Sequence, residues 1–311
     1  MKICFIGLGS IGKRHIRNLV CILNERNIKF TIDAVRSSET PLESEIQQLV
    51  NRCYFDFEII PSDYDIIFIT NPTFMHYETL VQVIDKTKHI FLEKPVFHTI
   101  QINKEKLKYK SDTVYYVACP LRYHPVIRYV KEFVKEHSVF SVRAICSSYL
   151  PNWRKGVDYR KTYSAYEEQG GGVSLDLIHE WDYIRYIFGQ PLQVFNIQQK
   201  CSQLEITSED ISVYIAKYSD KVVEVHLDYF GKKNTREVML YTSDEVVRAD
   251  VINNIIYFYG NKEKQLQLEY EDMYLNEMNH FLDLIVLGLK NENNIEDAYE
   301  TLKIAIGEEE K

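Results

Sequence analysis

Short apolar runs alternate with amphipathic stretches along the N-terminal part of the chain. Strand-like runs occupy residues 2–7, 30–36, 64–70, 89–93 and 113–120. The intervals between them, such as residues 76–86, place apolar side chains at helical spacing. Alternating strands and helices with short connections form parallel sheets that helices cover on both faces. The pattern therefore predicts a doubly wound α/β domain over residues 1–120.

The pattern changes after residue 120. A helical stretch at 126–137 precedes long runs in which apolar and polar side chains alternate: residues 138–150, 193–204, 211–219, 221–230, 236–243 and 253–260. Such alternation is typical of antiparallel strands with one face on a core and the other exposed. Residues 121–311 are predicted to form an α+β domain with a large, mostly antiparallel sheet. We expect its free face to support a homodimer or homotetramer.

Composition excludes several classes of partner. The chain has 311 residues, 45% of them hydrophobic, which is enough to fill two cores. A formal charge of −8 argues against a nucleic-acid partner. We find no apolar stretch of membrane-spanning length, no signal-peptide pattern and no cysteine or histidine spacing that would hold a metal. We expect a cytoplasmic protein with reduced cysteines that acts on a small molecule.

The sequence GLGSIG at 7–12 stands between the first strand and the first helix. In a dinucleotide-binding Rossmann turn, Gly7 would permit the tight turn, Gly9 the approach of the pyrophosphate and Gly12 close packing of helix on strand. The helix N-terminus at Ser10 and Ile11 would then face the phosphates. A glycine-rich turn without a ligand is the alternative.

The residues at the end of the second strand bear on the choice of cofactor. Arg36 and Ser37 supply donors that suit a 2′-phosphate, so the sequence favours NADP. Asp33 lies inside the strand and could instead bond a bare ribose, which would favour NAD.

Two further strands end in TNP at 70–72 and EKP at 93–95, on the carboxyl edge where open α/β sheets bind ligands. Taken alone, EKP could be a simple turn. However, the chain also contains other motifs in a definite order and separation. Because of these motifs, it resembles the Gfo/Idh/MocA oxidoreductase family: GLGSIGKRH (7–15), TNPTFMH (70–76), FLEKPV (91–96) and GGGVSLDLIHEWD (170–182). The resemblance implies that Lys94 binds the reacting oxygen and assists proton transfer. Further cofactor contacts are expected from this edge: Thr70, Asn71, Pro72, His76, Glu93 and Lys94.

The second-domain motif offers an acid/base candidate. Asp176 and His179 lie three residues apart, on one face of a predicted helix that ends at Gly189. The resemblance implies that His179 acts as acid or base, but many family members place the aspartate four residues before the histidine, where this chain has Leu175. Asp176 is therefore expected to orient the substrate. A histidine merely satisfied by a helix neighbour is the alternative.

Donor and aromatic side chains near the domain junction and in a following loop suit a polar substrate. These candidates are Arg122, His124, Trp153, Arg154, Tyr159 and Arg160. The W-R and Y-R pairs resemble a subgroup met in cell-surface glycan synthesis, where substrates are sugars or nucleotide sugars. A solvated basic loop would explain the same residues.

These features together predict an NAD(P)-dependent oxidoreductase that moves a hydride between nicotinamide and a hydroxyl or carbonyl carbon of a sugar derivative. Reduction of a non-sugar, such as a cyclitol, dihydrodiol or tetrapyrrole, is one alternative. A dinucleotide-binding regulator without turnover is another, and the shifted position of Asp176 favours it.

Overall fold

The computed structural model describes residues 1–307, which divide into two compact units. The first unit contains Met1–Ala118 and Tyr274–Tyr299, and the second contains Cys119–Met273 with the described residues from Glu300 onward. The first crossing of the chain between units lies close to residue 120. The assignment of all later residues to the second domain needs correction, because 274–299 belong to the first unit.

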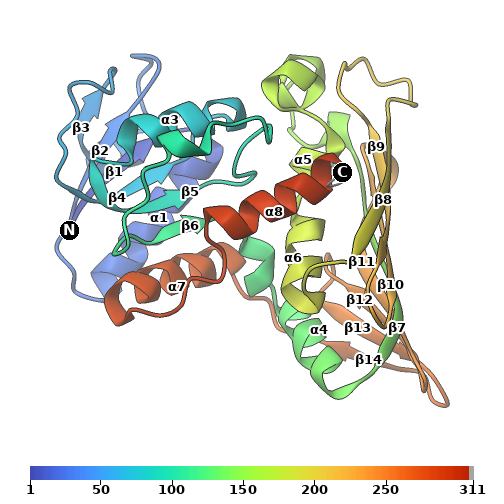
Figure 1. Ribbon diagram of the computed structural model, residues 1–311. Coiled ribbons are helices and arrows are strands. Elements are labelled where there is room, and N and C mark those ends of the chain that lie inside the picture. The colour runs from blue at the N-terminus through green and yellow to red at the C-terminus, as the bar shows by residue number, and fades with distance from the viewer. Residues whose placement is uncertain (308–311) are drawn as a thin grey trace. The chain divides into compact units, whose positions relative to one another are not determined.

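A six-stranded sheet forms the centre of the first unit, with the order β3-β2-β1-β4-β5-β6 (Figure 1). All its neighbouring strands are parallel. The strands are β1 (Lys2–Ile6), β2 (Thr31–Val35), β3 (Val50–Tyr54), β4 (Tyr64–Ile69), β5 (Thr87–Leu92) and β6 (Tyr115–Val117). The order reverses between β1 and β4, which is the switch point where doubly wound sheets bind ligands. The predicted Rossmann architecture is confirmed.

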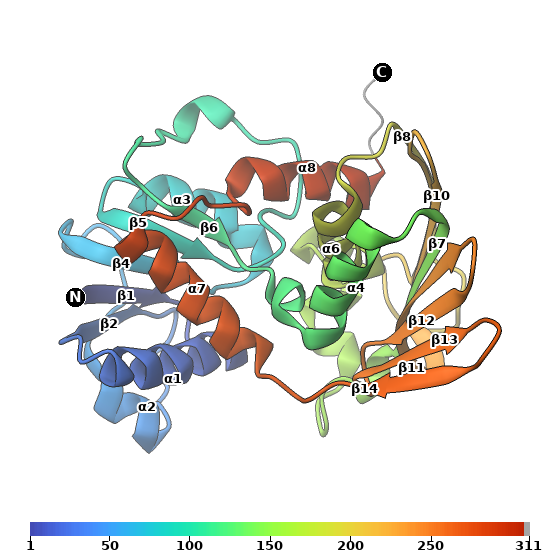
Figure 2. The same cartoon turned by 90° about the horizontal axis from the view of Figure 1, so that it is seen from below.

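Helices cover both faces of this sheet. Figure 2 shows α1 and α7 on one side and α3 on the other. The helices of this unit are α1 (Ser10–Glu25), α2 (Ser44–Leu49), α3 (His76–Val83) and α7 (Met273–Leu287). Phe281 of α7 contacts the rings of Phe68, Phe91 and Tyr116 on three neighbouring strands. These buried rings need an apolar cover, which explains why a helix so late in the chain packs with the first unit.

The second unit contains an eight-stranded sheet of order β14-β13-β12-β11-β7-β10-β9-β8. Only β7 and β10 are parallel neighbours, so the prediction of a mostly antiparallel sheet is confirmed. Its strands are β7 (Val139–Tyr149), β8 (Gln193–Gln199), β9 (Ile211–Lys217), β10 (Val222–Asp228), β11 (Phe230–Thr242), β12 (Val246–Asp250), β13 (Ile255–Tyr259) and β14 (Lys264–Gln267).

One face of this second sheet packs on α4 (Pro125–Glu136), α5 (Val173–Asp176) and α6 (His179–Phe188), as Figure 1 shows. The opposite face is open and mixes apolar with charged side chains: Phe195, Ile197 and Ile215 are 55%, 69% and 51% exposed, and Arg143 pairs with Glu224 in the same cross-strand row as Phe195 and Ile215. The remaining helix of the described residues is α8 (Ile295–Ile306). The short 3₁₀ turns are η1 (Thr73–Met75), η2 (Lys104–Lys106), η3 (Pro120–Tyr123), η4 (Leu150–Asn152), η5 (Tyr159–Lys161), η6 (Tyr163–Ala165) and η7 (Glu167–Gln169). Within residues 1–307, none of the helices has the length and apolar character needed to cross a bilayer.

Candidate active site

The three glycines of the turn after β1 have different surroundings. Gly7 has φ +90°, and a Cβ there would lie 2.7 Å from the Asn71 backbone. A Cβ on Gly12 would lie 2.5 Å from the carbonyl oxygen of Gly7 and 2.7 Å from the Thr70 hydroxyl oxygen. A Cβ on Gly9 would meet no atom within 4 Å. The fold itself therefore requires Gly7 and Gly12, whereas Gly9 borders open space.

The N-terminus of α1 fits a phosphate group. Gly9 is its N-cap, no side chain caps the helix, and the first turn, which begins at Ser10 and Ile11, has no acidic residue. Uncapped N–H groups and the positive end of the helix dipole favour an anion at this position. With the open space beside Gly9, this end of α1 has the room and the donors that a dinucleotide pyrophosphate requires.

The residues at the end of β2 separate the two ribose hypotheses. Asp33 is buried, and its carboxylate accepts hydrogen bonds from the Tyr64 hydroxyl at 2.8 Å and from Asn51 Nδ2 at 3.0 Å. Both carboxylate oxygens are thus engaged inside the fold, which weakens the alternative in which Asp33 bonds the ribose. Arg36 donates to the carbonyl oxygen of Thr40 at the strand end, where Ser37 is exposed.

The TNP segment ties the end of β4 to the glycine turn. The Thr70 hydroxyl donates to the carbonyl oxygen of Gly7 at 2.6 Å. Asn71 donates through Nδ2 to the Thr79 hydroxyl at 2.7 Å, and Pro72 is the N-cap of η1. These contacts fix the loop beside the turn.

His76 links the two strand-end loops. It is 1% exposed, with Nδ1 2.9 Å from the carbonyl oxygen of Pro95 and Nε2 2.9 Å from that of Asn71. Burial lowers the pKa of His76. The structure thus gives this residue a role in holding TNP against EKP, and its predicted contact with the cofactor stays a prediction.

Glu93 is held from two sides where β5 ends. Its Oε1 lies 2.5 Å from Nε2 of His15 in α1, and its Oε2 accepts the backbone N–H of Lys94 at 3.1 Å. Burial alone would raise the pKa of Glu93, but the hydrogen bond and charge of His15, with Lys94 beside it, hold that pKa below its ordinary value. Lys94 itself is partly exposed.

His15 was not among the predicted site residues. The available signal was its place at the end of GLGSIGKRH, three residues after Gly12 and so on the same face of α1.

The helix predicted to carry both Asp176 and His179 is interrupted. Helix α5 ends at Asp176 and α6 begins at His179, with Leu177 and Ile178 in a turn between them. Leu177 has φ −100° and ψ 27°, outside the helical region, and both turn residues are buried. The expectation that Asp176 and His179 share one regular helical face is therefore wrong.

Two tyrosines surround Asp176. Its carboxylate is buried and accepts a hydrogen bond from the Tyr229 hydroxyl at 2.6 Å. The charge of Asp176 and burial raise the pKa of Tyr163, and burial and the same charge raise the pKa of Tyr229. Neither tyrosine was predicted as a site residue. Tyr163 opens the loop that leads into the three glycines, whereas Tyr229 is distant in sequence and only the fold brings it to Asp176.

Two of the predicted substrate residues join this cluster. The Trp153 ring meets the Tyr229 ring edge-on at 5.2 Å, and its Nε1 donates to the Ser148 hydroxyl at 2.9 Å. The guanidinium of Arg154 lies 5.3 Å from the centre of the Tyr163 ring. The structure therefore gathers an aromatic and cationic cluster around Asp176.

Two other predicted substrate residues have local partners instead. Exposed Arg160 pairs with Asp158 at 2.9 Å and with Glu205 at 3.2 Å. The Tyr159 hydroxyl accepts the backbone N–H of Glu205 at 3.2 Å. For these two residues the structure favours the solvated loop.

His124 caps a helix. Its Nδ1 accepts the backbone N–H of Val126 at the start of α4 at 3.3 Å. Burial, followed by the charge of Arg236, lowers the pKa of His124 to about 4. At neutral pH this ring is uncharged, as its accepting Nδ1 requires.

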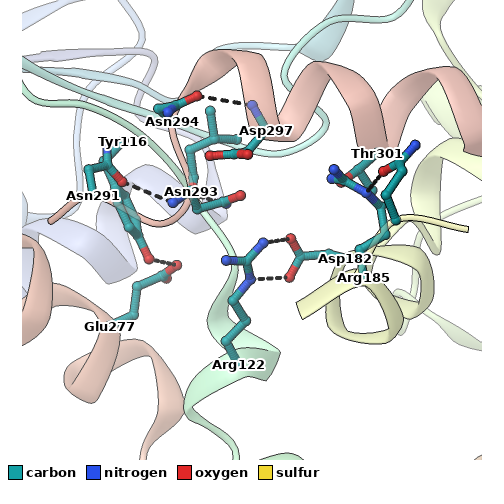
Figure 3. A network of polar contacts seen from close by, with 12 residues as sticks. Tyr116, Arg122, Asp182, Arg185, Glu277, Asn291, Asn293, Asn294, Asp297 and Thr301 are labelled. Atoms are coloured by element: carbon teal, nitrogen blue, oxygen red, sulfur yellow. Dashed lines mark hydrogen bonds and ion pairs between the residues drawn. The ribbon is translucent and has the colours of Figure 1, made fainter. Parts of the chain in front are cut away.

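Arg122 forms a two-pronged ion pair with Asp182, shown in Figure 3. The distances are 3.0 Å from Nε to Oδ2 and 2.7 Å from Nη2 to Oδ1, and both residues are buried. Glu180 is also buried, 2.7 Å from the guanidinium of Arg236. Two ion pairs thus fix the first turn of α6, from which His179 projects. The bidentate pair gives Arg122 a role in positioning this turn.

Residues 1–116 match the family described as oxidoreductases with an NAD-binding Rossmann fold. Myo-inositol 2-dehydrogenase of Thermotoga maritima is 25% identical, over 93% of this chain and 89% of that protein. The match identifies residues 1–116 with the Gfo/Idh/MocA oxidoreductase family. YrbE of Bacillus subtilis, an uncharacterized oxidoreductase, is 29% identical to this chain, over 59% of this chain and 52% of that protein.

Solved structures of two dehydrogenases share the fold over nearly the full length of this chain. Levoglucosan dehydrogenase in complex with NADH and levoglucosan has a TM-score of 0.83 at 14% identity, covering 98% of this chain and 95% of that one. UDP-N-acetylglucosamine 3-dehydrogenase of Acidithiobacillus ferrooxidans has a TM-score of 0.76 at 16% identity, with the same coverage. At these identities the likeness establishes the fold alone. The predicted resemblance to the family is confirmed over residues 1–116, and the oxidoreductase class is confirmed with it, while the residue roles remain predictions.

Proposed function

We propose that the chain oxidises or reduces a carbon that bears a hydroxyl or carbonyl group on a sugar or sugar derivative, with Lys94 and His179 moving the proton. The observation that carries the proposal is the position of Lys94. It follows β5 at the carboxyl edge of the parallel sheet, and buried Glu93 holds its main chain. The family match of residues 1–116 and relatives named as dehydrogenases of inositols and sugars support a substrate with several hydroxyls.

The bound nicotinamide would supply the hydride acceptor or donor. The chain would contribute position and proton transfer. Ser10 and Gly9 would face the phosphates from the N-terminus of α1. Lys94 would donate a proton to the substrate oxygen in reduction, or bind that oxygen and accept its proton in oxidation. His179 would act as the second acid or base, and Asp176, fixed by Tyr229, would orient a substrate hydroxyl.

NADP is our proposed cofactor, with NAD as the alternative. Two observations support this choice. Both oxygens of the Asp33 carboxylate already accept a hydrogen bond, from Tyr64 and from Asn51, which weakens the alternative in which Asp33 bonds the ribose. Arg36 and exposed Ser37 stand at the end of β2, where a 2′-phosphate would need a cation and a hydroxyl.

The test begins with separate fluorescence titrations using NADPH and NADH. Oxidation of inositols, anhydro sugars and nucleotide sugars is then followed by nicotinamide absorbance. Lys94→Ala should lower kcat by about 10²- to 10⁴-fold, the usual contribution of an acid/base group. Lys88→Ala is the matched control, since Lys88 lies on β5, the strand that Lys94 follows, is exposed and pairs only with Asp65 among the contacts described.

Each outcome decides a different part of the proposal. Tighter binding of NADH would move the cofactor choice to NAD and leave the reaction unchanged. Full turnover in Lys94→Ala would remove the proposed role of this lysine. Cofactor binding without oxidation or reduction of any substrate would favour the non-catalytic regulator.

A further inference from the structure

His15 and Glu93 form a buried polar connection in the first unit that neither cofactor binding nor proton transfer explains. The histidine lies in α1, one turn beyond Gly12, and is 0% exposed. Its Nε2 is 2.5 Å from Glu93 Oε1, and the other oxygen of the same carboxylate accepts the Lys94 N–H. One carboxylate thus joins the phosphate-binding helix to the main chain of the proposed catalytic lysine.

The surroundings of this connection are apolar. The His15 ring meets the Phe91 ring edge-on at 4.9 Å and also contacts the rings of Phe68 and Tyr274. Its Nδ1 is buried and has no hydrogen-bond partner among the described residues. A carboxylate in such a place is unfavourable unless it is paired. An apolar side chain at position 15 would fill the same space without introducing this polar requirement.

We propose that His15 is a positioning residue: through Glu93 it sets where Lys94 lies relative to the phosphate-binding end of α1. This inference rests on the proposed function. The connection is short, because it consists of two hydrogen bonds: one between His15 of α1 and Glu93, and one from the backbone N–H of Lys94 to Glu93. Small displacements of a reacting group are enough to change rate, by up to about 10²-fold for about 1 Å.

Three variants test this role. His15→Leu removes the donor and keeps an apolar side chain, while His15→Gln keeps an N–H at a similar distance from the backbone. Leu19→Ala is the matched control for stability, because Leu19 is 0% exposed in the same helix and has no polar connection to Glu93. Each variant is measured for kcat at saturating NAD(P)H or NAD(P)+, and for cofactor affinity by fluorescence.

We expect His15→Leu to lower kcat by about 10- to 100-fold, as expected for a misplaced reacting group. Its cofactor affinity should be unchanged, His15→Gln should restore most of kcat, and Leu19→Ala should keep kcat despite lower thermal stability. If Leu19→Ala lost as much kcat as His15→Leu, or if His15→Leu lost none, His15 would be a packing residue only.

A second readout does not depend on turnover. The rate at which an amine-reactive reagent labels Lys94 is measured by mass spectrometry in the cofactor-saturated protein, with exposed Lys88 as the internal reference. His15→Leu should change the rate at Lys94 several-fold and leave Lys88 unchanged, and unchanged labelling at both lysines would overturn the inference. Altered labelling in a protein that turns over no sugar would uphold it and reject the proposed function. If His15→Leu left the labelling of Lys94 unaltered while Lys94→Ala was inactive, the inference would be overturned and the proposed function would be upheld.

Discussion

Gly9, the N-cap of α1, and Gly12, three residues further on inside that helix, should respond differently to substitution. In Gly12→Ala the new Cβ would lie 2.5 Å from the Gly7 carbonyl oxygen and 2.7 Å from the Thr70 hydroxyl oxygen. Relieving the first contact requires a backbone shift, and overpacking of this kind costs about 1–3 kcal/mol. Alanine has a better helix propensity than glycine, which stabilises the folded state by about 1 kcal/mol and offsets part of this cost. The net loss of stability, up to about 2 kcal/mol, should lower Tm by a few degrees.

Gly9→Val introduces a larger side chain without a clash in the protein. Gly9 has φ −68° and ψ −172°, which other residues adopt, and a Cβ there meets nothing within 4 Å. The new side chain would instead occupy the space beside the N-terminus of α1 where we place the phosphates. Loss of one hydrogen bond to a charged group costs about 1.5–3 kcal/mol, which corresponds to about 10- to 150-fold in Kd.

Differential scanning fluorimetry without ligand measures the stability of each variant, and fluorescence titration measures dinucleotide affinity. We expect Gly9→Val to keep the wild-type Tm and lose affinity, and Gly12→Ala to lose Tm. Wild-type affinity in Gly9→Val would refute the placement of the phosphates. A loss of Tm in Gly9→Val as large as that in Gly12→Ala would show that the open space beside Gly9 is needed by the fold itself.

Two further predictions concern the second unit. The folded-state pKa of His124, about 4, lies below the value of about 6.5 expected for an unfolded chain. The unfolded state therefore binds more protons between these values, and stability should fall by up to about 3 kcal/mol as pH drops through this window. His124→Asn, which keeps a capping acceptor, should show a smaller fall in Tm from pH 7 to 4.5, whereas parallel profiles would contradict the assignment. The second prediction concerns self-association: Ile197→Asp on the open sheet face should reduce the mass measured by light scattering. Ile59→Asp is the control and should not reduce it, since Ile59 is 64% exposed but lies in the first unit. A wild-type protein that is monomeric would contradict the predicted oligomer.

The parallel sheet was predictable because its buried strands are strongly apolar. Residues 2–7, 64–70 and 89–93 correspond to β1, β4 and β5 within a few residues at each end. Strands β3, β12 and β14 were not predicted. Strand β14 has every residue exposed, and β3 has mostly polar or partly exposed residues, so neither carries the apolar pattern on which sequence reasoning depends. Their formation follows from pairing with neighbours that the fold supplies.

The glycine turn, EKP and the histidine motif were visible as short patterns, but their partners were not. Nothing in the local sequence indicates that Tyr229 would donate to Asp176 or that α7 would cover the first sheet. The break at Leu177 was equally hidden, because the surrounding residues suit a helix. Such contacts depend on side chains that are distant in sequence, and only tertiary packing brings them together.

The charged residues of the EKP and HEWD motifs show why such motifs contain more charges than proton transfer requires. Lys94 and His179 are partly exposed. The acidic residues beside them are paired inside the fold: Glu93 with His15, Glu180 with Arg236 and Asp182 with Arg122. Buried ion pairs add little stability compared with well-packed apolar residues, but removal of one partner is strongly destabilising. Their value at these positions is therefore geometric: each carboxylate accepts only one arrangement of its neighbours, and that arrangement sets the backbone from which Lys94 or His179 projects.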